Sequence, residues 1–383
     1  MNTVSVIVPV YHGKKYIESM IRQVEACQLC AAGQAKTELL FVNDDPDEPI
    51  GAYRSGEIDL VVLETAENRG IHGARAEGVK RCGGEYILLL DQDDRILPGY
   101  IKSQLAAIRG YDAAVCMALH EGKALYNRTL PFEAAASREH MLRKGNAIIS
   151  PGQVLIRKDA VAALWKETRL SQNGADDWLL WLCMMQEGRS FALNKEILFE
   201  HVMERDNTSM RQLQMQRSEW EVLRLIQGSA IFSGEDAAVL EQTIQNLMEM
   251  RIELLGKFQR ISAVYDAWVS LRNRDIHLAW YLREKGCQRV AVYGVTHLGM
   301  RLFEELERDG IEVPCFIDRN AQFLDGPVKI YDPMETFPAV DAVVISLVQQ
   351  EDKIRALLRA RAAVPVWTIS ELVGNTEQMG GAE

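Results

Sequence analysis

The chain has 383 residues, of which 48% are hydrophobic and 25% are charged, and its 54 acidic and 43 basic residues give a formal net charge of −11. Such a chain is long enough for two or three domains with substantial cores, and its composition is ordinary for a globular protein. The negative charge argues against nucleic acid as a partner, and no apolar run reaches the roughly 18 residues that a membrane-spanning helix needs.

The first predicted element is a β-branched strand at residues 4–11, which begins too close to the first residue to leave room for a signal peptide. A helix is predicted from about Lys14 to Cys27, because its apolar residues recur on one face. Two more strands follow at residues 39–42 and 60–63. Strands that alternate with helices predict a mostly parallel, doubly wound α/β sheet.

A further strand at residues 86–90 ends in the sequence Asp-Gln-Asp-Asp at residues 91–94. In open α/β sheets, ligands bind at the carboxyl ends of the strands. Neighbouring carboxylates repel one another unless a cation or hydrogen-bond donors lie among them. An Asp-x-Asp sequence at this place suits a hard divalent ion that takes its other oxygens from water and a substrate diphosphate. The alternative is an acidic turn before a helix that begins near Pro98.

Several short motifs in a fixed order identify a protein family more specifically than any single motif does. The chain contains Val-Pro-Val-Tyr at 8–11, Val-Asn-Asp at 42–44, Asn-x-Gly-x-x-x-Ala-Arg at 68–75 and Leu-Asp-x-Asp-Asp at 90–94. Over about residues 3–210, this series resembles the inverting family-2 glycosyltransferases of GT-A fold. The chain departs from the commonest family pattern after Asp44, where Asp45 and Pro46 replace Gly-Ser, and this leaves the roles of Asp45 and Asp47 open.

The resemblance implies a set of donor-binding residues: Pro9, Tyr11, Asp44, Asn68, Arg75, Asp91 and Asp93. The nucleoside pocket would be lined by the first three of these, with Asp44 accepting a hydrogen bond from the base. Asn68 and Arg75 would lie near the base and ribose. Asp93 would ligate the Mn²⁺ or Mg²⁺ that bridges the diphosphate, and Asp91 would approach the ribose or the metal.

The pair Asp176 and Asp177, before an apolar run, is the candidate catalytic pair. An inverting transfer needs a carboxylate that takes the proton of the acceptor hydroxyl and a Lewis acid that stabilises the departing diphosphate. The resemblance gives the role of the base to Asp177. An Asp before an apolar helical run is also a favoured N-cap, so we expect Asp176 to cap the helix while Asp177 faces the cleft.

Residues 197–201 are predicted to form an edge strand that ends at His201. Many members of the family place a histidine shortly before Asn-x-Ser, in some cases as a further metal ligand. In this chain His201 lies six residues before Asn207, and Glu204 is nearer the expected position. His201 is therefore a candidate metal ligand, with Glu204 and a purely structural histidine as open alternatives.

Residues 211–286 have a helical pattern, with an apolar stripe from Ile244 to Trp268 that Arg251 interrupts. An intramolecular core is the favoured interpretation, because a coiled coil is expected to show about three to four clean heptads. A homodimer through this helix stays open as an alternative.

Residues 287–383 return to an α/β pattern that resembles the small Rossmann-like modules of some bacterial glycosyltransferases. The dinucleotide fingerprint would need glycines at 294, 296 and 299, but residue 296 is a threonine. Asp318 follows the next strand, at a ribose-binding position. A docking or assembly role is favoured, with nucleotide binding as the alternative.

The sequence therefore predicts a GT-A domain at residues 1–210, a helical segment at 211–286 and a Rossmann-like domain at 287–383. The predicted activity is a metal-dependent inverting transfer of a sugar from a nucleotide-diphosphate donor, with UDP as the expected nucleotide, to a hydroxyl of a glycan or lipid-linked acceptor. A nucleotidyltransferase and a non-catalytic nucleotide-sugar binding or scaffold protein are the alternatives. The seven cysteines are odd in number and scattered, so we expect a cytoplasmic location. Peripheral binding at the inner face of the membrane is an open alternative.

Overall fold

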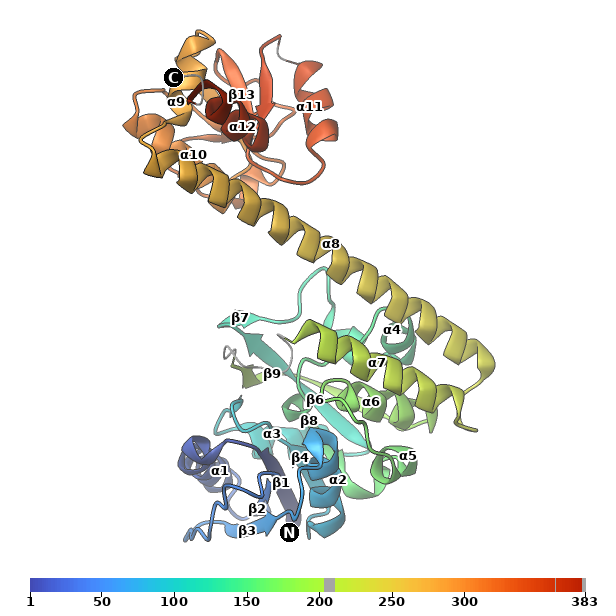
Figure 1. Ribbon diagram of the computed structural model, residues 1–383. Coiled ribbons are helices and arrows are strands. Elements are labelled where there is room, and N and C mark those ends of the chain that lie inside the picture. Colours follow the sequence, from blue (N-terminus) through green and yellow to red (C-terminus); the bar gives the residue numbers. More distant parts are fainter. Residues whose placement is uncertain (203–210, 362, 381–383) are drawn as a thin grey trace. The chain divides into compact units, whose positions relative to one another are not determined.

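The computed structural model describes residues 1–202, 211–361 and 363–380. It divides into two compact units, residues 1–249 and 250–383, and the division lies within the long helix α8, Gly234–Asn273 (Figure 1). Across the described residues, no helix is both long enough and apolar enough to cross a membrane. Each unit is built around a sheet of its own.

The first unit contains a nine-stranded sheet with the order β3-β2-β1-β4-β8-β6-β9-β5, in which β7 pairs with β6. Its strands are β1 (Asn2–Val10), β2 (Ala35–Asn43), β3 (Asp59–Glu64), β4 (Tyr86–Leu89), β5 (Arg95–Ile96), β6 (Ala113–His120), β7 (Lys123–Ala124), β8 (Val154–Arg157) and β9 (Phe191–His201). Strands β1 to β4 are parallel, whereas β8 runs antiparallel to both β4 and β6. The predicted α/β class is confirmed.

Two apolar layers cover the two faces of this sheet. In β1, Ile7 belongs to the layer that includes residues of α2 and α6, whereas Val6 and Val8 belong to the layer that includes residues of α1 and α3. The helices of this unit are α1 (Ile17–Cys30), α2 (Gly70–Arg81), α3 (Tyr100–Ala107), α4 (Arg138–Arg143), α5 (Ala163–Glu167), α6 (Asp176–Gln186), α7 (Gln212–Gln227) and the first part of α8. Because the central strands are buried on both faces, their sequences are nearly continuous apolar runs.

The parallel register brings the polar strand ends to one edge of the sheet. Val10 lies opposite Asn43 at the carboxyl ends of β1 and β2, and Ile7 of β1 lies opposite Leu89 of β4, two residues before Asp91. The polar clusters that follow these strands therefore lie at the same edge of the sheet.

The strand predicted at residues 197–201 is present, but the prediction that it lies at the edge of the sheet is wrong. It is the last part of β9, an eleven-residue strand that pairs along β6 on one side and with the two-residue strand β5 on the other. Residues 191–196 show little alternation in sequence, yet the pairing with β6 begins at Phe191. Hydrogen bonds to β6 therefore extend β9 over residues 191–196, where the local sequence pattern does not predict a strand.

The second unit has a five-stranded parallel sheet with the order β12-β11-β10-β13-β14. Its elements are α9 (Leu278–Glu284), β10 (Val290–Tyr293), α10 (His297–Arg308), β11 (Phe316–Ile317), β12 (Ile330–Tyr331), β13 (Ala342–Ile345), α11 (Glu351–Arg359), β14 (Val366–Thr368) and α12 (Ile369–Gly380). The small parallel C-terminal sheet that the sequence predicted is therefore present.

The turn from β10 into α10 explains why a threonine replaces the second fingerprint glycine. The Thr296 hydroxyl accepts a hydrogen bond from the Gly299 backbone amide at 3.0 Å and caps the helix. A Cβ at Gly299 would lie 2.2 Å from the Gly294 carbonyl oxygen, so glycine is required there. Asp318 accepts a hydrogen bond from the Val295 amide at 3.1 Å, which ties its carboxylate to this turn.

Candidate active site

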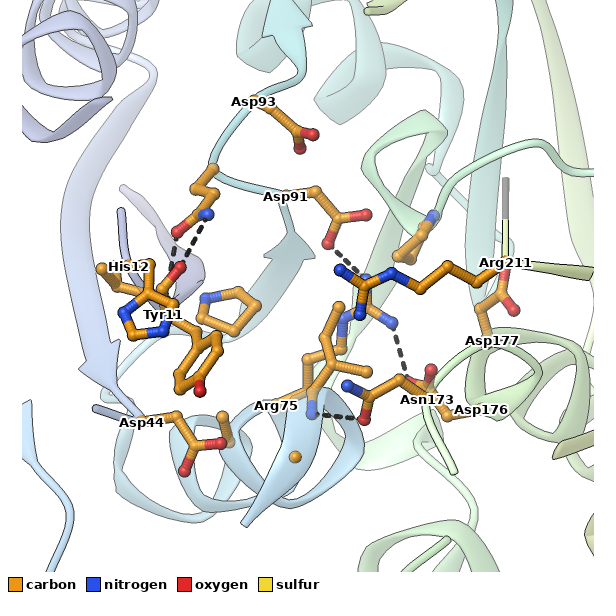
Figure 2. Close-up of a pocket in the computed structure, with 18 of the residues that line it drawn as sticks. Tyr11, His12, Asp44, Arg75, Asp91, Asp93, Asn173, Asp176, Asp177 and Arg211 are labelled. Carbon is orange, nitrogen blue, oxygen red and sulfur yellow. Dashed lines mark hydrogen bonds and ion pairs between the residues drawn. The ribbon is translucent and has the colours of Figure 1, made fainter. Parts of the chain in front are cut away.

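A cavity of about 990 Å³ opens at the carboxyl ends of β1, β2 and β4 (Figure 2). It brings together every described residue that the sequence singled out for donor, metal or catalysis: Pro9, Tyr11, Asp44, Asn68, Arg75, Asp91, Asp93, Asp176, Asp177 and His201. Glu204 and Asn207 lie outside the described residues. The volume is at the upper end of the usual range for small-molecule sites.

Gln92, the middle residue of the Asp-x-Asp sequence, ties this loop to the end of β1. Its side chain accepts a hydrogen bond from the Tyr11 amide at 3.2 Å and donates one to the Tyr11 carbonyl at 3.1 Å (Figure 2). Gly13 leaves room for this side chain, because a Cβ there would lie 1.9 Å from the Gln92 Oε1 atom. Sequence reasoning missed both residues, since the middle position of the motif carries no charge.

Asp44 lines the cavity directly after β2. Its Oδ1 atom accepts hydrogen bonds from the Arg69 amide at 2.7 Å and from the Thr65 hydroxyl at 3.4 Å. Burial raises the pKa of Asp44, and these donors oppose the rise. The carboxylate is thus held in a fixed orientation by the loop between β3 and α2.

The turn that opens α2 fixes the next part of the wall. Asn68 accepts a hydrogen bond from the Gly70 amide at 3.0 Å, and the Asn173 side chain accepts one from the Ile71 amide at 3.1 Å. Gly70 has a φ of 71° and little space above its Cα, where a Cβ would lie 2.8 Å from the Asn173 Oδ1 atom. Asn173 was missed because it precedes Asp176 in a loop with no distinguishing pattern.

Arg75 is buried among the carboxylates of the cavity. Its guanidinium forms an ion pair with Asp176 at 2.8 Å and a second ion pair with Asp91 (Figure 2). Burial alone would lower the pKa of Arg75, but Asp176 and then Asp91 raise it above its usual value, so the group is always charged. The arginine therefore joins the Asp-x-Asp loop to the start of α6.

The capping role expected for Asp176 is wrong. The N-cap of α6 is Ala175, no side chain caps this helix end, and Asp176 is the first helical residue. The ion pair with the buried guanidinium of Arg75 takes the Asp176 carboxylate away from the backbone amides, since a charge-assisted bond to a guanidinium is the stronger interaction.

Asp177 lies at the cavity wall, where it is almost completely buried. Its Oδ2 atom accepts a hydrogen bond from the Asn146 side chain at 2.9 Å, and its Oδ1 atom accepts one from the Trp178 amide at 2.7 Å. Burial, and then repulsion from Asp176, raises the pKa of Asp177 to about 7. A carboxylate with a pKa near neutrality is suited to taking a proton at physiological pH. Asn146 was also missed by sequence reasoning, since it lies 31 residues from Asp177.

The acidic residues of the Asp-x-Asp-Asp sequence have different partners. Asp94 is fully buried and accepts hydrogen bonds from the Ser150 hydroxyl at 2.7 Å and from the His201 Nδ1 atom at 2.8 Å. Asp91 is paired with Arg75. Asp93 is half-buried, and burial followed by the charges of Asp91 and Asp94 raises its pKa to about 7.

Asp91, Asp93 and His201 fit a divalent metal whose other ligands come mainly from the bound substrate. Asp94 orients His201 through Nδ1, so the Nε2 atom is the nitrogen left for a ligand. Within the described residues, Asp91, Asp93 and His201 do not bring three ligand atoms within 4.8 Å of one another. A metal beside Asp93 would therefore complete its shell with water and diphosphate oxygens, as Mg²⁺ commonly does.

Other lining residues were not anticipated. Arg211, just before α7, extends into the cavity (Figure 2). The ring of His120 stacks on His201 with centroids 5.4 Å apart. A single arginine before a helix, or a histidine at the end of β6, carries no sequence signal of its own, and only the folded chain reveals its neighbours.

Comparison with protein families and curated proteins finds similarity to glycosyltransferases. Residues 5–165 match the model of glycosyl transferase family 2. The chain is 26% identical over 233 residues to the minor teichoic acid biosynthesis protein GgaB of Bacillus subtilis (strain 168), a match that covers 56% of this chain and 25% of GgaB. It is 23% identical over 203 residues to an uncharacterized glycosyltransferase of Haemophilus influenzae, covering 51% of this chain and 67% of that protein. The chain thus spans about a quarter of the length of GgaB.

Among solved structures, the chain is similar to residues 1–349 of S. aureus TarS. The sequence identity is 16% and the TM-score is 0.45, over 63% of this chain and 70% of that chain. The same similarity is found to this TarS fragment in complex with UDP-GlcNAc, over 71% of that chain.

Proposed function

Because residues 5–165 match the model of glycosyl transferase family 2, we propose that this chain is a metal-dependent, inverting glycosyltransferase with a UDP-linked sugar donor. The observation that carries the proposal is the single cavity in which Asp93, the Arg75 ion pairs and Asp177 meet. The acceptor is proposed to be a hydroxyl of a glycan or lipid-linked glycan. The name of GgaB, a teichoic acid biosynthesis protein, supports a cell-surface glycan as the acceptor class.

Donor binding is proposed to use the part of the cavity between β1 and α2. Tyr11 and Asp44 would bind the base, with Asp44 accepting a hydrogen bond from a ring N–H of uracil. The fixed orientation of Asp44, which its bonds to Arg69 and Thr65 impose, supports this role. Asn68 would lie near the ribose.

The diphosphate is proposed to lie beside Asp93 and Arg211. Asp93 and His201 would hold Mg²⁺ or Mn²⁺, which when bound supplies positive charge to the leaving diphosphate. Arg75 holds Asp91 in place through their ion pair and so keeps the loop in position. Arg211 extends into the cavity as a second source of positive charge for the phosphates.

Asp177 is proposed to act as the general base. As the acceptor oxygen bonds to the anomeric carbon, the bond from that carbon to the diphosphate oxygen breaks, and the hydroxyl proton passes to the Asp177 carboxylate. Asn146 and the Trp178 amide orient this carboxylate. Attack from the face opposite the diphosphate inverts the anomeric configuration.

A panel of nucleotide sugars tests the proposal without knowledge of the acceptor. The full chain is incubated with each sugar and Mn²⁺ or Mg²⁺, and the release of nucleoside diphosphate by slow water attack is measured. We expect release from a UDP-sugar, loss of release in Asp93→Ala, and normal release in Asp325→Ala, an exposed aspartate outside the cavity. Release that persists in Asp93→Ala, or no UDP-sugar turnover by the wild type, would contradict the proposal.

A further inference from the structure

A second group of ligand-type side chains lies at the rim of the cavity. His12 follows β1, and Asp45 and Glu48 follow β2. One ligand atom from each of these side chains lies within 4.8 Å of the others, and no other such group of three occurs in the part of the chain that the structure describes. Asp45 is also the residue at which this chain departs from the family pattern, so the donor site does not account for it.

His12 and Asp45 are in contact without a hydrogen bond between their side chains. The Asp45 Oδ2 atom lies 2.7 Å from the His12 Nδ1 atom. Asp45 is only 4% exposed, and within the described residues its Oδ2 atom has no hydrogen-bond partner. A carboxylate oxygen and an imidazole nitrogen this close need a proton or a cation between them, and a buried carboxylate oxygen without a partner costs about 1–3 kcal/mol or more.

The other interactions of Asp45 leave this oxygen for a ligand. Its Oδ1 atom accepts a hydrogen bond from the Asp47 amide at 3.2 Å, and its own amide donates to the Asn43 side chain at 3.3 Å. The loop is closed by a bond from the Glu48 amide to the Asp45 carbonyl at 3.2 Å. These bonds fix the carboxylate with Oδ2 toward His12, while the exposed Glu48 can turn its flexible side chain toward both.

We propose that His12, Asp45 and Glu48 form a second divalent-metal site, distinct from the one at Asp93. One imidazole nitrogen and two carboxylates are a donor set that suits Zn²⁺ with a water in the remaining position. An all-oxygen ion such as Mg²⁺ is less well matched, because imidazole favours the borderline transition metals.

The ion would join the segments that follow β1 and β2. Tyr11 and His12 of the first segment both line the cavity, and so does Asp44, which precedes Asp45 in the second segment. Zinc would therefore hold in place the part of the cavity wall against which a nucleobase would lie. The inference about metal binding does not depend on the proposed transferase activity.

Zinc binding to the Asp93→Ala protein tests the site, because this background lacks the carboxylate of the other metal position. After treatment with a chelator, the full-length Asp93→Ala chain should bind one Zn²⁺ in calorimetry. Adding His12→Ala should weaken this binding at least 100-fold, and adding Glu48→Gln should weaken it about tenfold. Adding His297→Ala, at an exposed histidine of the second unit, should leave it unchanged. His12 is 68% exposed, so its replacement is not expected to disturb the fold, which circular dichroism checks.

X-ray absorption spectroscopy at the zinc edge then identifies the ligand atoms, and one imidazole nitrogen and two carboxylate oxygens are expected. The proposal is overturned if the Asp93→Ala chain binds no zinc, or if the His12→Ala variant binds it as tightly. In the latter case His12 and Asp45 form an ion pair and no more. Failure of the transferase proposal would show instead as absent UDP-sugar turnover with this zinc binding intact.

Discussion

Asp177→Asn separates a catalytic base from a structural carboxylate. The substitution keeps the shape of the side chain and an oxygen that can accept the Trp178 amide proton. It removes the ability to take a proton at neutral pH. We therefore expect sugar transfer to fall by roughly a hundredfold or more, while binding of the donor stays near normal.

The same substitution should stabilise the protein, and the gain should depend on pH. In the folded state the pKa of Asp177 is raised from 3.8 to about 7. Below pH 4 the carboxyl is protonated in both states and adds no penalty. Between about pH 4 and pH 7 the unfolded state ionises first, so this group lowers stability as the pH rises, and above pH 7 the penalty is complete.

The size of the gain follows from the pKa. One pKa unit corresponds to about 1.4 kcal/mol, so a rise of about three units gives a penalty of at most about 4 kcal/mol above pH 7. In the variant, the Asn146 side-chain NH₂ group would face either the NH₂ group or the uncharged oxygen of the new asparagine. Losing the bond to a charged carboxylate lowers the free energy of unfolding by about 1–3 kcal/mol. A net stabilisation of about 1–3 kcal/mol at pH 8 is the expected result, and it should vanish or change sign at pH 4.

Urea unfolding at pH 4, 6 and 8, together with transfer assays, measures both effects. Wild-type transfer should rise with pH and level off above about pH 7 as Asp177 loses its proton. Asp176→Asn is the matched control: it weakens the ion pair with Arg75 and should destabilise the protein at neutral pH. Normal transfer by Asp177→Asn, or a stability gain that is the same at every pH, would refute the reasoning.

Three further changes test other parts of the site. Asp93→Ala should abolish metal-dependent UDP binding in calorimetry with Mn²⁺ while the melting temperature stays within a few degrees; unchanged affinity would exclude a metal at this loop. Arg75→Met should cost about 3–5 kcal/mol in urea unfolding, because it leaves Asp176 and Asp91 without their buried partner; a change below about 1 kcal/mol would contradict the ion pairs. Gly13→Ala should displace the Gln92 side chain and weaken donor binding as much as Gln92→Ala does, whereas Gly33→Ala, at a glycine with free space around it, should leave donor binding unchanged.

The sequence by itself determined the α/β class and the positions of the polar strand ends. Apolar runs such as that of β1 report burial on both faces, and burial is a local property that composition records. The ordered motifs and the Asp176–Asp177 pair also singled out Asp44, Asp93 and Asp177, and all three line the cavity.

The partners of these residues were decided only by the tertiary structure. Arg75 is paired with Asp176, 101 residues away, and His201 with Asp94, 107 residues away. Local pattern instead favoured a helix cap for Asp176 and an edge position for the end of β9, and both were wrong. A buried charge takes the strongest partner that the fold brings within reach, and an edge becomes an interior strand when a neighbour supplies hydrogen bonds. Both outcomes depend on contacts between distant segments, which periodicity and propensity along the chain do not encode.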